Sequence, residues 1–131
     1  MRRMSQAGWT ILVADDDPVI LGLLEVNFEM EGFTVVTAEN GADALERARE
    51  AKPDILVLDV MMPKMTGHEV AAAIRDDPDL AGTPVIFVSA KAQGADVAVG
   101  MDLGAVDYVT KPFDPIDLVE RVNVALEKST R

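Results

Sequence analysis

Short apolar runs, each ending at a polar side chain and each followed by a segment of helical spacing, recur along the chain and constrain its fold most. The third run is Ile-Leu-Val-Leu at residues 55–58, and it ends at Asp59. Continuous rather than alternating apolarity is typical of a strand that is covered on both faces. The predicted strands are residues 11–14, 33–38, 55–58, 85–88 and 107–110.

Helical segments separate these runs. The spacing of apolar residues and the positions of glycine and proline predict helices over residues 19–31, 40–52, 69–75, 93–103 and the stretch after Asp114. Strands that are joined through helices must run parallel, with right-handed crossovers. The expected fold is therefore α/β. It is a single doubly wound (βα)5 domain with a five-stranded parallel sheet in the order 2-1-3-4-5 and helices on both faces, as in flavodoxin-like folds.

The length of 131 residues suits one domain, and we expect residues 9–128 to form it, with residues 1–8 and 129–131 as tails. There is no signal peptide and no apolar run of roughly 20 residues, which predicts a cytoplasmic protein that does not enter membranes. The absence of cysteine excludes disulfides and thiolate metal sites. A formal net charge of −11 argues against nucleic-acid binding by this domain, because such affinity depends on Lys and Arg.

Side chains that can take part in chemistry follow four of the predicted strands. Asp15 and Asp16 follow the first strand, Asp59 the third, Ser89 the fourth and Lys111 the fifth. The carboxyl ends of parallel strands lie at one edge of the sheet, where ligands bind near the reversal of strand order. We therefore expect three carboxylates, a hydroxyl and an ammonium group to meet at this edge.

This combination of groups suits phosphoryl transfer. Clustered carboxylates repel one another, and a hard divalent cation such as Mg²⁺ relieves the repulsion through oxygen ligands. Lys111 adds positive charge, and Ser89 offers a hydroxyl hydrogen to a phosphoryl oxygen. A metal-activated aspartate is an accepted nucleophile for such a transfer. Each residue taken singly fits an ordinary loop acid, strand end or solvated lysine, so the prediction rests on their combination.

Four sequence motifs, in the order and spacing of one protein family, span roughly residues 10–128. They are ILVADDD at 11–17, DILVLDVMMP at 54–63 with Gly67, PVIFVSA at 84–90 and GAVDYVTKPF at 104–113. With these motifs the chain resembles the response-regulator receiver domains of two-component phosphorelay signalling. Any one motif alone is weakly specific, but the four together are highly specific.

The resemblance implies that Asp59 accepts a phosphoryl group from a phosphohistidine in a Mg²⁺-dependent reaction. Asp15 and Asp16 would hold Mg²⁺ together with Asp59, and Asp16 would be the more direct ligand of the pair. The backbone carbonyl of Met61 would complete the protein ligands. Asp17 would cap the following helix rather than bind the metal ion.

The resemblance also assigns roles to the later strand ends. Ser89 would contact the attached phosphoryl group, and Lys111 would pair with Asp59 or with the phosphoryl oxygens. A cis bond before Pro112 would help to aim the lysine. Tyr108 would be the aromatic switch residue and turn inward when Ser89 is drawn to the phosphate. A half-buried structural tyrosine fits this strand nearly as well, because strands favour aromatic residues.

The implied phosphodonor is a sensor histidine kinase or a histidine phosphotransfer protein. The domain would catalyse its own phosphorylation and slow dephosphorylation, as a signalling domain rather than an enzyme. Output to an effector, or self-association, would use the face formed by the fourth helix, fifth strand and fifth helix.

Gly94 and Gly100 predict that the fourth helix is loosely held, since each costs about 1 kcal/mol relative to Ala inside a helix. Met61 and Lys91 lie where the family tunes the lifetime of the phosphoryl group. No effector domain fits after the last helix, which predicts a stand-alone regulator or a fragment.

Two other functions remain open. The segment Asp15–Val19 also fits the Asp-x-Asp-x-Thr/Val motif of haloacid-dehalogenase-like phosphatases, in which Asp15 rather than Asp59 would be phosphorylated. The short chain, the lack of a cap insertion and the lack of an acidic pair after the fourth strand weigh against this function. A degenerate receiver would bind partners without phosphorylation, but such domains usually lose an acid or the lysine, and this chain keeps the whole set.

Two predictions concern side chains near Asp59. His68, close to a predicted helix start, is expected to be solvated. Met61, Met62 and Met65 are expected to fill gaps in the packing rather than to form a partner-binding surface, although methionine suits both roles.

Overall fold

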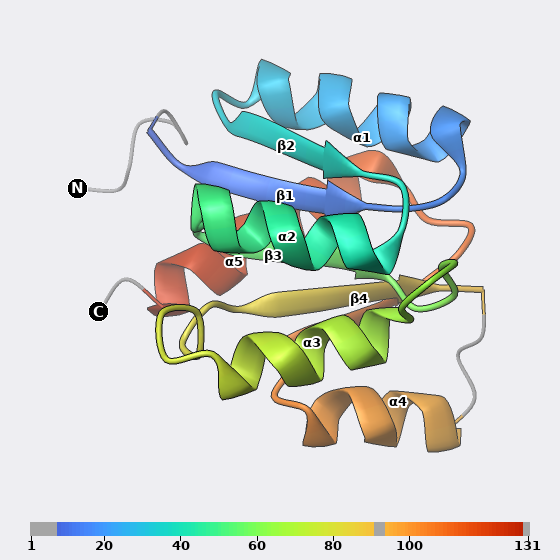
Figure 1. Ribbon diagram of the computed structural model, residues 1–131. Coiled ribbons are helices and arrows are strands. Elements are labelled where there is room, and N and C mark those ends of the chain that lie inside the picture. Colours follow the sequence, from blue (N-terminus) through green and yellow to red (C-terminus); the bar gives the residue numbers. More distant parts are fainter. Residues whose placement is uncertain (1–7, 91–93, 130–131) are drawn as a thin grey trace.

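The computed structural model describes residues 8–90 and 94–129, in which strands and helices alternate along the chain (Figure 1). The strands are β1 Thr10–Ala14, β2 Thr34–Ala38, β3 Ile55–Asp59, β4 Val85–Ser89 and β5 Asp107–Thr110. The helices are α1 Pro18–Met30, α2 Gly41–Ala51, α3 Gly67–Asp76, α4 Gly94–Asp102 and α5 Pro115–Ser129. The strands form one parallel sheet in the order β2-β1-β3-β4-β5. The predicted fold class and strand order are confirmed.

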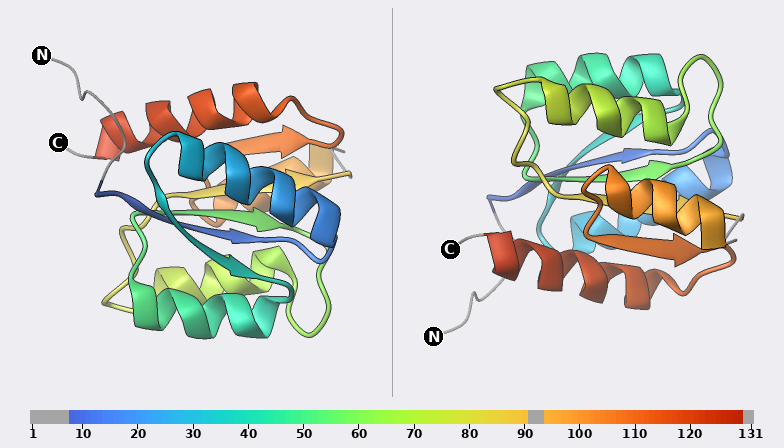
Figure 2. Two further views of the ribbon diagram at one scale, coloured as in Figure 1. Left: turned by 90° about the horizontal axis from the view of Figure 1, so that it is seen from above. Right: turned by 90° about the horizontal axis from the view of Figure 1, so that it is seen from below.

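Helices cover both faces of this sheet (Figure 2). Helices α1 and α5 pack on one face, against strand side chains such as Val13 and Val57. Helices α2 and α3 pack on the other face, against neighbouring side chains such as Leu12 and Leu58. Successive strand residues point to opposite faces, so a sheet that is covered twice needs apolar residues at every position. This packing explains the unbroken apolar runs of β3 and β4, which are buried along their whole length.

Side-chain caps set the starts of the helices. Helix α1 begins at Pro18, directly after the cap Asp17, whose Oδ1 accepts a hydrogen bond from the Val19 amide at 2.9 Å. Helix α3 begins at Gly67, two residues early, because Thr66 and Glu69 form a capping box. The expected helix-cap role of Asp17 is confirmed.

Parts of the sequence prediction lie outside the described residues, among them Lys91, Gln93 and most of the two expected tails. Among the helices of the described part, none combines the length and the apolarity that crossing a bilayer requires.

Helix α4 packs closely on two aromatic rings through a glycine. Gly100 is buried, and a Cβ atom there would lie 2.9 Å from Cδ2 of Phe87 and 3.1 Å from Cδ2 of Tyr108. Gly94 is the first residue of the helix, where the cost of an interior glycine does not apply. Close packing therefore accounts for Gly100, and the loose attachment of α4 stays a prediction.

The variant Gly100→Ala is expected to lower the free energy of unfolding by about 1–2 kcal/mol, because overpacking against the rings of Phe87 and Tyr108 outweighs the gain in helix propensity. The matched variant Gly22→Ala, inside α1, should raise the free energy of unfolding by up to about 1 kcal/mol, because a Cβ atom at Gly22 meets nothing within 4 Å. Urea unfolding of both variants measures the difference. A stabilised Gly100→Ala would show instead that α4 moves away from the rings at little cost.

Candidate functional site

The predicted site residues meet at the carboxyl edge of the sheet, toward which the strand arrows point in Figure 1. Asp15 follows β1, Asp59 ends β3, Ser89 ends β4 and Lys111 follows β5. The strand order reverses at β1, which lies between β2 and β3, so the edge beside β1 and β3 is where ligands bind in this class of sheet. The topology therefore brings together residues that are far apart in the sequence.

Asp15, Asp16 and Asp59 form an acidic cluster. One carboxylate oxygen from each residue lies within 4.8 Å of the others. Asp15 and Asp59 are only 2% and 4% exposed, whereas Asp16 is exposed to solvent. Asp17 stays outside the cluster, since its carboxylate caps α1 while its amide donates to Asp15 Oδ1 at 2.9 Å. A set of oxygen donors with one solvent-facing member fits a hard cation such as Mg²⁺, which keeps several of its waters.

Lys111 bridges the two buried acids. Its Nζ atom lies 2.9 Å from Asp15 Oδ2 and 3.3 Å from Asp59 Oδ2. The bond between Lys111 and Pro112 is cis, as the resemblance implied. One ammonium group does not balance three carboxylates, so the cluster keeps an excess of negative charge that a divalent cation would neutralise.

The surroundings of Asp59 and Lys111 shift the pKa values of both side chains. Burial, followed by the nearby charge of Asp15, raises the pKa of Asp59 to about 6, against the opposing effects of Lys111 and of the Met61 amide. Burial by itself lowers the pKa of Lys111, but the hydrogen bond to Asp15 and the charges of both acids raise that pKa above its ordinary value. Lys111 is therefore protonated at neutral pH. Asp59 is mostly ionised at that pH, and because its pKa is raised, keeping it ionised in the folded protein lowers the free energy of unfolding.

In Mg²⁺-free buffer at about pH 7.5, Asp59→Asn is expected to raise the free energy of unfolding by about 1–2 kcal/mol. The pKa of Asp59 is higher in the folded protein than its ordinary value of 3.8, so folding favours the protonated acid. Stability of the wild type therefore falls as pH rises from about 4 to about 6, and the advantage of the variant should vanish below about pH 4. Urea titrations across this range measure both proteins, and an advantage that grows on acidification would contradict the assignment.

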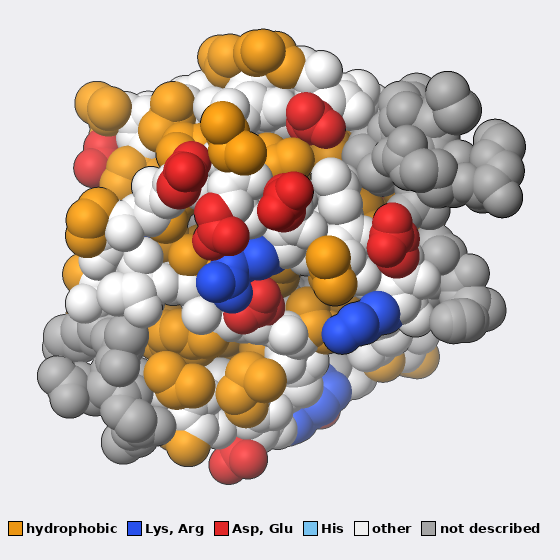
Figure 3. All heavy atoms as spheres, turned by 180° about the vertical axis from the view of Figure 1, so that it is seen from behind, with side chains coloured by type: hydrophobic (Ala, Val, Ile, Leu, Met, Phe, Trp, Pro, Cys, Tyr) orange, Lys and Arg blue, Asp and Glu red, His pale blue; other side chains and the backbone are white. Residues whose placement is uncertain are grey.

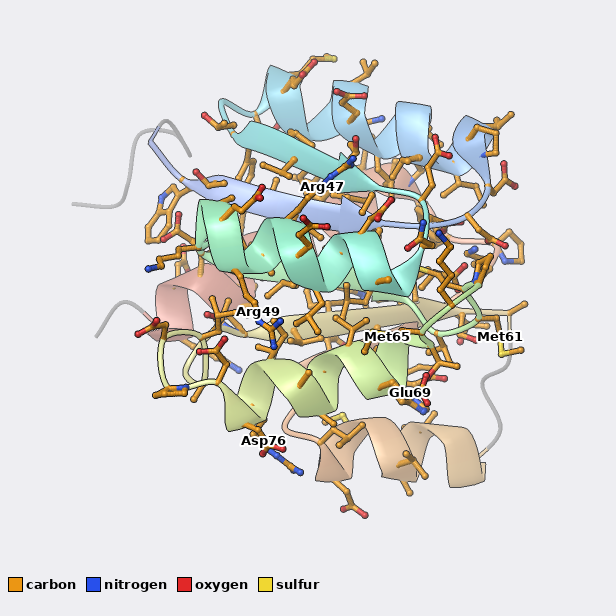
Figure 4. All side chains as sticks on the ribbon, in the orientation of Figure 1. Arg47, Arg49, Met61, Met65, Glu69 and Asp76 are labelled. Carbon is orange, nitrogen blue, oxygen red and sulfur yellow. The ribbon has the colours of Figure 1, made fainter. Side chains whose placement is uncertain are left out.

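The loop after β3 adds a backbone donor to the site. The Met61 amide donates to Asp59 Oδ1 at 3.3 Å, while the Met61 side chain is 52% exposed. Met62 is buried and Met65 packs against the same core cluster. Figure 4 shows Met61 on the outer part of this loop and Met65 beside α2 and α3. Gap filling is thus confirmed for Met62 and Met65 but is wrong for Met61, and metal ligation by the Met61 carbonyl stays a prediction.

Ser89 and Tyr108 belong to the last two strands, β4 and β5. Ser89 is fully buried, and its carbonyl accepts a hydrogen bond from the Lys111 amide at 2.8 Å. Tyr108 is half-buried, with its ring centroid 6.0 Å from that of Phe87. This position is compatible with both roles considered for Tyr108, so its switch function, like the phosphoryl contact of Ser89, stays a prediction.

The prediction that His68 is solvated is wrong. Its ring is partly buried and lies edge-on to Phe87, with centroids 4.9 Å apart. The error arose because the helix was predicted to start at residue 69, after His68. Because α3 begins at Gly67, His68 belongs to its first turn and packs on the sheet rather than extending from a loop.

Two glycines shape the loop after β3, and one of them was not singled out in the sequence. A Cβ atom at Gly67 would lie 2.4 Å from the carbonyl oxygen of Asp59. A Cβ atom at Gly41 would lie 2.0 Å from the carbonyl oxygen of Met65. Gly67 is part of a family motif. Gly41 could be noticed in the sequence only because glycine is a poor helix former and stands here directly after the helix cap Asn40. Glycine is needed at position 41 because the backbone of Met65 lies against it, and sequence patterns do not predict this contact.

The side of the molecule formed by α1 and α5 carries exposed hydrophobic side chains (Figure 3). On α1 they are Val19, Leu23, Val26 and Met30, and on α5 they are Ile116 and Val124. Figure 3 shows hydrophobic side chains on this face around a central group of acidic and basic ones.

Comparison with known proteins agrees with this geometry. The family model of the response regulator receiver domain matches residues 11–123. The alkaline phosphatase synthesis transcriptional regulatory protein PhoP of Bacillus subtilis is 43% identical over 119 residues, which are 91% of this chain and 49% of that protein. The chain therefore spans about half the length of the curated relative that it matches.

Two solved structures extend the comparison. The receiver domain of Francisella response regulator 1452 has a TM-score of 0.86 and 32% identity, covering 94% of this chain and 100% of that one. The Borrelia burgdorferi complex of CheX and CheY with BeF3 and Mg²⁺ has a TM-score of 0.83 and 29% identity, covering 91% and 90% of the two chains. Together with the family match and the strand order, these likenesses establish that the chain belongs to the response regulator receiver domains of two-component signalling.

Proposed function

We propose that this receiver domain accepts a phosphoryl group from a phosphohistidine onto Asp59 in a Mg²⁺-dependent reaction. The observation that carries the proposal is the position of Asp59, with one carboxylate oxygen 3.3 Å from Lys111 Nζ and the acids Asp15 and Asp16 beside it. The donor would be a sensor histidine kinase or a histidine phosphotransfer protein. The receiver domain itself would extend over residues 9–128, and a cytoplasmic location stays a prediction.

In the proposed transfer, a carboxylate oxygen of Asp59 forms a bond to phosphorus while the bond from phosphorus to the histidine nitrogen breaks. The nitrogen keeps the electron pair of the broken bond and takes up a proton, which releases a neutral imidazole. Lys111 offsets the negative charge on the phosphoryl oxygens, and the Ser89 hydroxyl donates to one of them. In the slow dephosphorylation that follows, a water oxygen forms a bond to phosphorus while the bond from phosphorus to the Asp59 oxygen breaks, which releases inorganic phosphate and restores the carboxylate.

The residues that would hold Mg²⁺ are Asp15, Asp16, Asp59 and the backbone carbonyl of Met61. Their oxygen-only donor set suits this ion, and the excess negative charge of the cluster favours it. When bound, Mg²⁺ would supply positive charge that reduces repulsion between Asp59 and the incoming phosphoryl oxygens. The related CheX–CheY complex contains Mg²⁺, which supports this choice of ion here.

Mg²⁺ in large excess over its dissociation constant is expected to stabilise the wild type by about 2–3 kcal/mol, because the ion binds the folded state alone. Asp16→Asn should lose most of this stabilisation, since the variant lacks a charged ligand. Asp17→Asn is the matched control, and it should respond like the wild type because asparagine also caps helices. Thermal unfolding with and without Mg²⁺ gives the comparison, and equal responses of the two variants would count against this metal site.

The test of the proposed function is to map the modified residue. The protein is incubated with acetyl phosphate and Mg²⁺, and the phosphorylated aspartate is trapped by borohydride reduction and located by peptide mass spectrometry. We expect modification of Asp59 that depends on Mg²⁺. Modification of Asp15 would instead favour the phosphatase function, and the absence of modification would favour a degenerate receiver.

The output surface is proposed to be the face of α4, β5 and α5. Its polar centre is Arg121, whose Nη1 donates to both carboxylate oxygens of Asp107 at 2.9 Å, while Nε donates to Asp117 at 2.8 Å. Exposed hydrophobic residues of this face are Val99, Met101, Val106 and Val124. Phosphorylation would shift this face between two conformations that recognise an effector or a second copy of the chain. The B. subtilis relative PhoP is a transcriptional regulatory protein, which supports an output in gene regulation.

A further inference from the structure

The first turn of α2 lies in contact with the loop that follows β3. A Cβ atom at Gly41 would lie 2.0 Å from the Met65 carbonyl oxygen and 2.6 Å from both the carbonyl carbon and the Cβ atom of Met65. The Gly41 amide also donates to the Pro63 carbonyl at 3.3 Å. Because the nearest atoms belong to backbone, a side chain at position 41 has no flexible neighbour to displace. Space, rather than an unusual backbone angle, requires glycine here.

The same loop reaches the phosphoacceptor site within a few residues. The Met61 amide donates to Asp59 Oδ1 at 3.3 Å. The Val60 amide donates to the Val88 carbonyl at 3.1 Å, and the Gly67 amide donates to the Val60 carbonyl at 2.8 Å. These bonds fix the two ends of the loop on β4 and on the start of α3. The middle of the loop, residues 61–65, depends on what packs beneath it.

Two groups of contacts support the middle of the loop. The side chains of Met62 and Met65 enter the core between the sheet and helices α2 and α3. The backbone at Pro63 and Met65 rests on Gly41. Figure 4 shows Met65 beside the first turn of α2, and Met61 further out on the same loop. A shift of α2 relative to this loop would therefore move the backbone that faces Asp59.

We propose that Gly41 is a positioning residue for phosphoryl transfer. Its lack of a side chain lets α2 approach the loop closely, and this approach sets where the backbone of Met61 lies relative to Asp59. Gly41 itself touches neither the phosphoryl group nor the metal ion. The inference rests on the proposed function of Asp59, since it concerns the geometry of that site.

The proposal predicts a specific defect in Gly41→Ala. The added Cβ atom must push residues 63–65 away from α2 and carry Met61 with them. Supporting residues that orient a metal site typically affect metal affinity by ten-fold or more, so the dissociation constant for Mg²⁺ should rise about ten-fold. The helix should still form, because Ala44, Leu45 and Ala48 remain buried against the sheet.

The experiment compares the wild type with Gly41→Ala and Val122→Ala. Val122 is buried on α5, on the other face of the sheet, and its truncation provides a destabilised control with an intact loop. Mg²⁺ titrations followed by the backbone amide signals of Asp59 and Met61 give the dissociation constants, and acetyl phosphate gives the rate of modification. We expect displaced Met61 signals, weaker Mg²⁺ binding and slower modification in Gly41→Ala alone.

Two results would overturn the inference. Gly41→Ala could bind Mg²⁺ and react like the wild type, or Val122→Ala could lose as much Mg²⁺ affinity through reduced stability alone. A wild type that is not modified at Asp59 would instead refute the proposed function, whatever the variants do. If Gly41→Ala does not fold, Asn40→Ala perturbs the same turn more mildly by removing the cap on the Asp43 amide. It should weaken Mg²⁺ binding and displace the Met61 signal, and unchanged values would contradict the proposal.

Discussion

Asp59→Asn is expected to take up no phosphoryl group from acetyl phosphate under conditions in which the wild type is modified. An amide has almost the same shape as a carboxylate but lacks the nucleophilic oxygen, so the bond to phosphorus cannot form. The substitution also relieves the buried charge whose pKa is raised to about 6, so the variant should fold at least as well as the wild type. Intact-protein mass spectrometry measures the gain of one phosphoryl group.

Two further variants separate the possible acceptors. Asp76→Asn, at the far end of α3 (Figure 4), changes an exposed acid and should be modified like the wild type. Asp15→Asn should be modified more slowly but still at Asp59, because it loses a metal ligand and keeps the nucleophile. Persistent modification of Asp59→Asn at Asp15 would show that the acceptor was assigned to the wrong strand.

Lys111→Met should combine a loss of stability with a loss of reactivity. Removing the ammonium leaves Asp15 and Asp59 buried without their partner, and breaking a buried pair in this way costs about 2–4 kcal/mol of unfolding free energy. Phosphoryl uptake should slow at least about ten-fold, because a positive charge beside the reacting oxygens is lost. Urea unfolding in Mg²⁺-free buffer and the initial rate with acetyl phosphate measure the two effects.

The pH dependence of this loss identifies its cause. Without Lys111 the pKa of Asp59 should rise further, so the destabilisation should be largest at high pH and should diminish as the carboxylates become protonated on acidification. Lys64→Met, in the exposed part of the loop after β3, removes the same charge at the surface and should change stability and rate little. A destabilisation of Lys111→Met that does not depend on pH would point to lost packing rather than lost charge.

The sequence predicted those site residues that stand at the ends of strands. Asp15, Asp59 and Ser89 each follow an apolar run, and parallel strands expose their carboxyl ends at one edge. This inference needs only the alternation of strands and helices, which local spacing determines. The structure confirms that these residues lie together at this edge, whereas their chemical roles remain to be tested.

Sequence patterns did not reveal contacts between a helix and a ring on the sheet. His68 was expected in solvent but packs on Phe87, because the capping box starts α3 two residues early. Gly100 was interpreted as a source of looseness, whereas its place against Phe87 and Tyr108 gives it a packing role. In both cases the side chain, or its absence, is explained by packing on Phe87 of β4, and the spacing of residues within a helix does not reveal this contact.

The chain by itself determined the order of elements, the parallel sheet and the identity of the acids, hydroxyl and lysine at its edge, because these follow from periodicity and from the chirality of crossovers. Only the tertiary structure decided how close the groups lie, such as Lys111 Nζ at 2.9 Å from Asp15, and which loop atoms face Asp59. It also revealed the contact of Gly41 with the loop after β3. The physical reason is that distances across the sheet depend on the packing of several helices at once, which no local pattern in the sequence encodes.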